Sequence, residues 1–165
     1  MMTNEIDDVL RNDLFTKSIF EGVYALDKVP TNLQHNAIYV INLDKSKEKG
    51  SHWTALKIDR EQVIYFDSLA RPPPKEIVPK MCKIGKDILY ADIPIQSILS
   101  QVCGYHVLLV CLFWARGWSL KEIMTEIYKA QEKKYLRNDY LAVKVISSLT
   151  NLKERPLIDW MQIFP

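Results

Sequence analysis

Cys103 is the residue of this sequence best suited to act as a nucleophile. Gly104 follows it, and the almost entirely apolar stretch Tyr105–Trp114 predicts a buried helix that starts at this point. The first turn of a helix presents unpaired N–H groups and the positive end of the helix dipole, and both lower the pKa of a thiol. The alternative, which residue type alone favours, is that Cys103 is a small buried core residue.

Two further residues have the types needed to generate and orient a thiolate. A thiol nucleophile needs a base, and the base needs a partner that holds it in place. His52 begins one strand-like segment, 52–59, and Asp67 ends the next, 62–67. An antiparallel hairpin across the two-residue link brings both residues to one edge of the sheet. Taken singly, His52 is typical of a polar surface residue and Asp67 of a strand terminator.

A side-chain amide that could stabilise an oxyanion precedes the cysteine. Gln96 lies seven residues before Cys103, and its amide could donate to the oxyanion together with the backbone N–H of Cys103. Gln101 is nearer in sequence and is the alternative donor. His106, on the same predicted helix, is expected to satisfy a buried hydrogen bond rather than to act as the base. Cys111 is expected in the core.

The elements that position these residues are predicted to form a single α+β domain over residues 1–165. Strands are expected over 37–43, 52–59, 62–67 and 88–93. Helices are expected over 4–16, 75–83 and 105–114, from Ser119 to about 134, and over 139–149 with Asn138 as the cap; 20–36 is expected to be a loop. This order favours a mixed, mainly antiparallel sheet flanked by helices, with the nucleophile at the start of the central helix.

The composition excludes several classes of protein. The chain of 165 residues is 48% hydrophobic, and 22 Lys and Arg against 20 Asp and Glu give a net charge of +2. These values exclude wholesale disorder and give little expectation of nucleic-acid binding. No glycine-rich phosphate loop occurs, and three cysteines without CxxC spacing indicate neither a disulfide framework nor a metal site. Without a signal peptide or a membrane-length apolar run, we expect an intracellular protein that does not enter a membrane.

The ordered residues resemble the adenain-like cysteine proteases, the adenovirus maturation protease type, within the superfamily of the SUMO/ubiquitin-like-specific proteases. The shared order is His-Trp, an Asp at the end of the next strand, a Gln, and Cys-Gly at a helix start. The resemblance spans about residues 18–118. Its supporting stretches are GVYALDKVP at 22–30, AIYVIN at 37–42 before GSHW at 50–53, FDS at 66–68, and the seven-residue Gln96–Cys103 spacing that is also found in proteases of Maverick/Polinton-type elements.

The resemblance implies the papain-like fold of these proteases and a role for each matching residue. Cys103 is the implied nucleophile, His52 the general base, Asp67 its orienting partner and Gln96 the oxyanion donor. The residues implied to contact substrate are Ser51, Trp53 and Gly104. Trp53 would form a wall of a narrow cleft that admits small residues, glycine above all, beside the scissile bond. The chemistry requires no cofactor.

The implied function is a cysteine endopeptidase that cuts capsid or core precursor proteins of a virus or virus-like element at Gly-containing sites. The expected location is the host cytoplasm or nucleus, or the virion itself. Adenain also has a peptide activator and a DNA activator. Cys82, 21 residues before Cys103, occupies a place comparable to the thiol that binds the activating peptide; the alternative is a buried structural thiol.

Two other functions stay open from the sequence. Adenain has Glu where this chain has Asp67, and the Asp67-Ser68 pair resembles instead the isopeptidases that remove ubiquitin-like modifiers. The seven-residue spacing between Gln96 and Cys103 favours adenain. A third reading, from another class, is a catalytically inactive module of the same fold that binds peptides or has a structural role.

Overall fold

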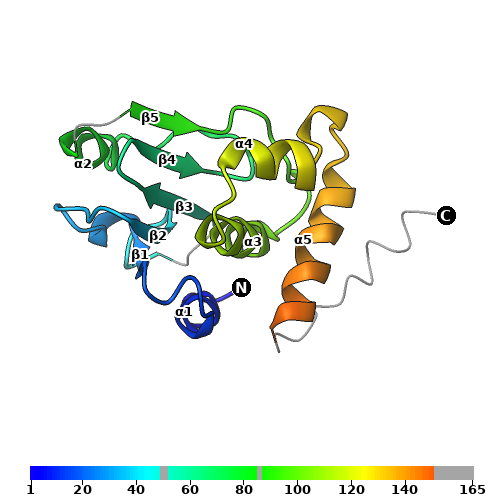
Figure 1. The fold of residues 1–165 in the computed structure, drawn as a ribbon, viewed down its shortest axis with the longest axis horizontal. Coiled ribbons are helices and arrows are strands. Elements are labelled where there is room, and N and C mark those ends of the chain that lie inside the picture. The colour runs from blue at the N-terminus through cyan, green and yellow to red at the C-terminus, as the bar shows by residue number, and fades with distance from the viewer. Residues whose placement is uncertain (49–51, 85–86, 151–165) are drawn as a thin grey trace.

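The fold is built on a five-stranded sheet with the strand order β1-β2-β3-β4-β5 (Figure 1). The computed structural model describes residues 1–48, 52–84 and 87–150. The strands are β1 Phe20–Ala25, β2 Ala37–Asn42, β3 Trp53–Ile58, β4 Gln62–Phe66 and β5 Asp87–Tyr90. The predicted mixed sheet is confirmed. Its antiparallel part comprises the three central strands, while β1 and β5 run parallel to their neighbours.

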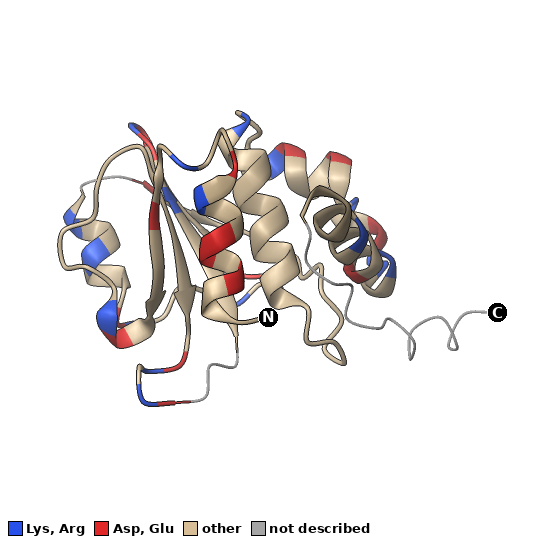
Figure 2. Ribbon diagram, turned by 90° about the horizontal axis from the view of Figure 1, so that it is seen from below, with Lys and Arg blue, Asp and Glu red and all other residues tan. Residues whose placement is uncertain are grey.

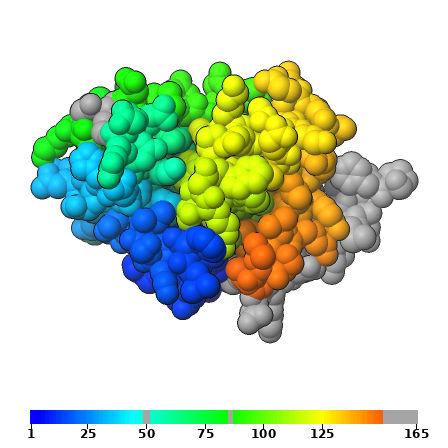
Figure 3. Space-filling model, viewed as in Figure 1, coloured from blue at the N-terminus to red at the C-terminus, as the bar shows by residue number. Residues whose placement is uncertain are grey.

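Helices cover both faces of this sheet (Figure 2). The helices are α1 Thr3–Asn12, α2 Val78–Lys83, α3 Cys103–Ala115, α4 Leu120–Glu122 and α5 Tyr135–Leu149. Three short helical segments complete them: the 3-10 helices η1 Leu26–Lys28 and η3 Ala130–Glu132, and the π-helix η2 Ile123–Ile127, which continues α4. On the face seen in Figure 3, α1, the α3–α4 region and α5 lie side by side.

The central strand β2 shows why its sequence is apolar without interruption. Ile38 and Val40 point to the face covered by α1, α3 and α5, whereas Tyr39 and Ile41 point to the face covered by α2. All four side chains are buried. A strand with cover on both faces has no polar side, which explains the continuous run.

Helix α3 is the centre of the larger core. It packs between the sheet and α5, and 11 of its 13 residues are buried. This environment explains its lack of a polar face, and it confirms the prediction that Cys111 belongs to the core. Burial raises the pKa of the Cys111 thiol far above the ordinary value, so this sulfur stays protonated.

The hairpin of β3 and β4 is confirmed, with Ala55 opposite Phe66 and Ile58 opposite Val63. At the end of the hairpin away from its turn, the same register places Asp67 opposite Thr54. His52, two residues before Thr54, is therefore a diagonal neighbour of Asp67 on the same face of the sheet. Diagonal neighbours in antiparallel strands are close enough for long side chains to meet. The predicted meeting of the two residues therefore follows from the register.

Other boundaries differ from the sequence-based predictions. The predicted loop over 20–36 contains β1, an edge strand whose pattern is interrupted by Gly22, where φ is +142° and the register with β2 shifts. An edge strand with a bulge lacks the regular alternation by which strands are recognised. Helix α1 ends at Asn12 instead of 16, because the Asp13 carboxylate accepts the N–H groups of Phe15 and Thr16 and begins a turn.

The helices after α3 are also placed differently in part. The predicted capping box is confirmed, since Ser119 Oγ accepts the N–H of Glu122 at 3.2 Å. The helix that it opens ends at Ile127 instead of 134. Helix α5 begins at Tyr135, so Asn138 is a buried residue of its first turn and not its cap. Among the described residues, none of the helices has the length and apolarity needed to cross a membrane.

Candidate active site

His52 and Asp67 form a buried pair at the open end of the β3–β4 hairpin. His52 Nε2 lies 2.8 Å from Asp67 Oδ1, and the two residues are 7% and 1% exposed. The same Oδ1 accepts the backbone N–H of Leu69 at 2.8 Å, which fixes the carboxylate within its own turn. The carboxylate thus sets the orientation of the imidazole and leaves the other ring nitrogen, Nδ1, for a second partner.

Cys103, the first residue of α3, lies beside His52. Hydrogen bonding from the His52 side chain and from the backbone N–H groups of Trp53 and Gly104 lowers the pKa of its thiol. Burial alone would raise the pKa of the Cys103 thiol, but these hydrogen bonds outweigh burial and hold the pKa below its ordinary value. The structure thus joins the three predicted residues Cys103, His52 and Asp67 into one chain of contacts.

The pKa of His52 is shifted in the opposite direction. Burial alone would lower it, but the hydrogen bonds to Asp67 and Cys103 raise the pKa of His52 to about 9. A thiol with a lowered pKa beside an imidazole with a raised pKa favours a thiolate–imidazolium pair near neutral pH. The two pKa shifts therefore have the directions that an activated thiol and a protonated imidazole would require.

Gln96 is held beside this chain of contacts by Ser68, the residue after Asp67. Ser68 Oγ donates to Gln96 Oε1 at 2.6 Å, and Ser68 O accepts the Gln96 backbone N–H at 3.1 Å. Gln96 Nε2 donates to Ser100 O at 3.0 Å. Because a carbonyl oxygen can only accept, these contacts define which end of the amide is the nitrogen. The nitrogen carries a second hydrogen, which is the one that an oxyanion would use.

Single alanine substitutions distinguish the two amide candidates. Gln96 is buried in a defined orientation, whereas Gln101 is exposed. We expect Gln96→Ala to lower kcat for peptide cleavage by roughly 10²–10³-fold, or about 2.7–4 kcal/mol, as for other lost oxyanion donors. Gln101→Ala should leave kcat nearly unchanged. The test is steady-state kinetics of both variants on the same peptide. A large loss of kcat in Gln101→Ala together with a retained kcat in Gln96→Ala would reverse the assignment.

Two of the residues predicted to contact substrate, Trp53 and Gly104, lie against Met1. Trp53 is almost buried, and its indole Nε1 donates to the carbonyl of Met1 at 3.3 Å. A Cβ atom built on Gly104 would stand only 2.8 Å from Met1 Sδ, so the methionine side chain lies directly on this glycine. Ser51, the third predicted contact, is outside the described residues. Met1 therefore covers the surface of Gly104 and Trp53 that the resemblance predicts to contact substrate.

Removal of the first two residues is expected to open the site. In a chain that begins at Thr3, the surfaces of Trp53 and Gly104 that Met1 now covers become available. We expect kcat/KM to rise by several-fold through a lower KM, with kcat unchanged, because displacement of Met1 no longer opposes binding. Kinetics of the truncated and full chains test this expectation. An unchanged or higher KM would show that Met1 does not compete with substrate.

Cys82 is an exposed thiol on α2. Helix α2 covers the face of the sheet opposite to α3, so the sheet separates Cys82 from Cys103. The alternative of a buried thiol is wrong, because this position of α2 faces outward, whereas its neighbour Met81 fills the core. The regulatory role of Cys82 stays a prediction.

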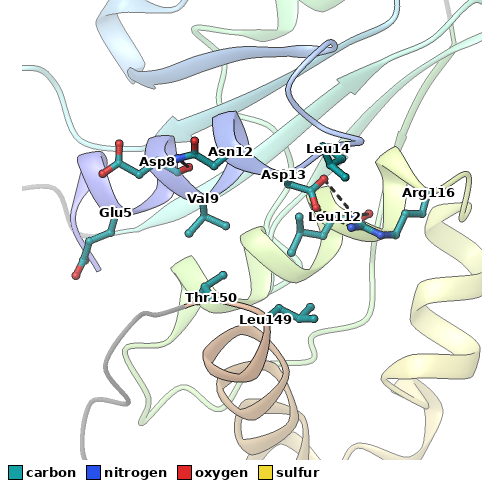
Figure 4. Close-up of a pocket in the computed structure, with 10 residues that line it drawn as sticks. All are labelled: Glu5, Asp8, Val9, Asn12, Asp13, Leu14, Leu112, Arg116, Leu149 and Thr150. Carbon is teal, nitrogen blue, oxygen red and sulfur yellow. Dashed lines mark hydrogen bonds and ion pairs between the residues drawn. The ribbon is translucent and has the colours of Figure 1, made fainter.

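A pocket away from Cys103 contains none of the predicted site residues (Figure 4). It has a volume of about 600 Å³ and lies between α1, the far end of α3 and the end of α5. An ion pair of Arg116 and Asp13, 2.6 Å apart, borders it. Within residues 1–48, 52–84 and 87–150, no group of three or more His, Cys, Asp or Glu side chains could hold a metal ion.

Sequence reasoning did not assign the positioning role of Ser68 or the cover formed by Met1. The signal for Ser68 was present, because a serine directly after the strand-terminating Asp67 must lie at the same sheet edge. Nothing in the sequence indicated that Met1 would meet Gly104, because more than one hundred residues separate them. The prediction for His106 is confirmed: it is fully buried and hydrogen-bonded to Tyr128 and Asp139.

Comparison with known proteins identifies the fold. No protein-family model and no curated protein matches the sequence. The crystal structure of the ASFV pS273R protease superposes with a TM-score of 0.57 and 16% identity over 85% of this chain and 66% of that one. The SUMO protease Ulp1, with its catalytic cysteine oxidised to a sulfinic acid, gives a TM-score of 0.47 and 15% identity over 91% and 79%.

The fold predicted from the resemblance is thereby confirmed through the ASFV protease. This chain spans just under two thirds of the length of that protease.

Proposed function

We propose that this chain is a cysteine endopeptidase with Cys103 as nucleophile. The observation that carries the proposal is the buried chain of contacts from Asp67 through His52 to Cys103 at the first residue of α3. Lowered thiol pKa, raised imidazole pKa and an oriented amide donor occur together at one end of the sheet. Perturbed groups in such an arrangement are typical of an active site rather than of a structural pair.

The geometry leads to a two-step hydrolysis. The Cys103 thiolate attacks the peptide carbonyl carbon, and the oxyanion accepts hydrogen bonds from the Gln96 side chain and the Cys103 backbone N–H. The His52 imidazolium then gives its proton to the leaving amine, which leaves a thioester on Cys103. In the second step, neutral His52 takes a proton from water, and the hydroxide attacks the thioester. The acid product leaves, and the ion pair forms again.

Substrates with small residues beside the scissile bond fit this site best. Met1 now lies against Gly104 and Trp53, so a substrate that takes its place would lie against the same two residues. We assign Gly-containing sites in capsid or core precursor proteins of a virus or virus-like element as the substrates. The fold shared with a viral protease supports this choice. Such an enzyme works in the host cytoplasm or nucleus, or within the virion.

An isopeptidase that removes ubiquitin-like modifiers is the second candidate. Its support is the turn Asp67-Ser68, in which one residue orients His52 and the next orients Gln96. DNA activation has less support: the net charge is +2, and Lys and Arg lie on several separate elements (Figure 2). Activation by a peptide stays a prediction.

The deciding experiment compares two kinds of substrate. Wild-type and Cys103→Ala proteins are incubated with a library of Gly-containing peptides and with ubiquitin-like fusion proteins, each with and without DNA. Cleavage of the peptides alone, dependent on Cys103, is the expected result. Cleavage of the fusion proteins alone would select the isopeptidase. No cleavage of either substrate would leave the fold as a binding or structural module.

A further inference from the structure

A second histidine–carboxylate pair lies buried behind the active site. His106, one turn along α3 from Cys103, has Nε2 at 2.8 Å from Asp139 Oδ1 of α5 and Nδ1 at 3.0 Å from the hydroxyl of Tyr128. His106 and Tyr128 are completely buried, and Asp139 is 1% exposed. These three residues take no part in the proposed chemistry. Burying polar side chains costs free energy, so their presence in the core needs another explanation.

The hydrogen bonds of this group are all satisfied when the imidazole is neutral. Burial raises the pKa of Tyr128 well above its ordinary value, so the phenol keeps its proton and can donate it to His106 Nδ1. His106 Nε2 then carries the other proton and donates to the Asp139 carboxylate. Protonated His106 would leave the Tyr128 hydroxyl hydrogen without an acceptor in this group. The Asp139 carboxylate therefore accepts from His106 through Oδ1, and its other oxygen, Oδ2, can accept a further hydrogen bond.

That second oxygen binds the loop that carries the oxyanion donor. Asp139 Oδ2 accepts the backbone N–H of Ser97 at 3.2 Å, and Ser97 directly follows Gln96. Ser97 O in turn accepts both the backbone N–H and the hydroxyl of Ser100, whose own carbonyl accepts Gln96 Nε2. Asp139 thus connects a closed set of hydrogen bonds around Gln96 to helix α5.

The loop has no apolar anchor at its tip. Ile98 and Leu99, the two residues between Ser97 and Ser100, are 88% and 85% exposed. Packing therefore does not fix residues 98 and 99, and beyond the buried Ile95 the segment that carries Gln96 is held by hydrogen bonds at its two ends. Ser68 supplies them on the sheet side, and Asp139 supplies them on the helix side.

We propose that Asp139 is a positioning residue, which acts through Ser97 to hold the Gln96 amide where the oxyanion forms. His106 and Tyr128 orient Asp139 for this task. The inference rests on the proposed protease function, because its catalytic consequence appears only when an oxyanion forms at Cys103. It assigns a role to a residue of α5 that lies 42 positions away from Ser97 in the chain.

The first test is the effect of Asp139→Ala on separate steps. We expect kcat to fall by roughly 10–10²-fold, less than for Gln96→Ala, with KM within about twofold of the wild type. The rate at which iodoacetamide alkylates Cys103 should stay within about twofold, because the thiolate and His52 do not contact Asp139. A purely structural role would disturb alkylation, KM and kcat together.

Coupling to Gln96 is the second test. If Asp139 acts through Gln96, the double variant Gln96→Ala/Asp139→Ala has the kcat of Gln96→Ala alone, within about twofold. If the loss in kcat of the double variant is instead the product of the two single-variant losses, the proposal is overturned. Ile146→Ala, which truncates a buried residue of the same helix, is the matched control and should keep kcat despite a lower unfolding temperature. Asp139→Glu keeps the anion but moves it by one methylene group, and it replaces the alanine variant if that variant does not fold.

Failure of the proposed function is distinguishable from failure of this inference. A wild-type chain that cleaves nothing refutes the protease. Amide hydrogen exchange then tests Asp139 alone: we expect the Ser97 N–H to exchange at least tenfold faster in Asp139→Ala than in Ile146→Ala. Equal exchange in the two variants would overturn the positioning role.

Discussion

Replacing Cys103 with alanine is expected to lower kcat/KM for peptide cleavage by about 10⁶-fold, the loss seen when a nucleophile of a coupled triad is removed. Without the sulfur no thioester forms, and His52 has no thiolate partner. The fold should persist, because the change removes one buried sulfur atom from the first turn of α3 and leaves its backbone hydrogen bonds intact. Kinetics on the best library peptide and a thermal unfolding curve measure the two effects.

The other two cysteines provide matched controls. Cys82→Ala alters an exposed thiol on the far side of the sheet and should change neither the stability nor the activity measured without an activating peptide. Cys111→Ala leaves a small cavity in the core, so we expect a loss of about 1 kcal/mol in the free energy of unfolding with kcat retained. Substantial cleavage by Cys103→Ala, or its loss in Cys82→Ala, would contradict the assignment of the nucleophile.

Asp67→Asn is the substitution with the second largest expected effect, a loss of about 10⁴-fold in kcat near neutral pH. Asparagine has the shape of aspartate, and its oxygen can still accept from His52 and Leu69. Its amide nitrogen takes the place of Asp67 Oδ2, which accepts no hydrogen bond within the part of the chain that the structure describes. The packing is therefore kept while the negative charge beside the imidazolium is lost.

The pH profile identifies the cause of that loss. In the wild type, His52 with a pKa of about 9 remains an imidazolium up to mildly alkaline pH. The proton for the leaving amine is lost above this value, so we expect kcat/KM to decline at about pH 9. Asp67 is one of the groups that raise this pKa, so Asp67→Asn should move the alkaline limb to lower pH. An unchanged limb and an unchanged rate would reduce Asp67 to a turn residue.

The parts of the site that the sequence could predict are those set by short-range geometry. His52 and Asp67 flank one hairpin with a two-residue link, so their meeting follows from strand pairing alone. Cys103 and the start of α3 coincide because the apolar run begins immediately after it. Gln96 was a candidate from its place before Cys103, with Gln101 as the alternative, and the seven-residue spacing known from the family resemblance favoured it.

Long-range contacts account for what the sequence could not predict. The bond from Asp139 to Ser97 and the contact of Met1 with Gly104 depend on how α5 and the N-terminus pack, and no local pattern encodes this packing. Strand β1 depends on parallel pairing with β2 and carries a bulge at Gly22, so its own residues did not indicate a strand. In each case a tertiary contact decided the local structure.

The most direct test of the central claim is the rate at which iodoacetamide alkylates each cysteine of the folded wild-type chain as a function of pH. Ordinary thiols ionise only near pH 8.5, so differences in thiolate content are largest at about pH 6–7. There we predict that Cys103 reacts at least about tenfold faster than the exposed Cys82, that Cys111 does not react, and that Asp67→Asn slows Cys103 alone. Equal rates for Cys103 and Cys82 across this range would contradict an activated thiol, and with it the proposed protease.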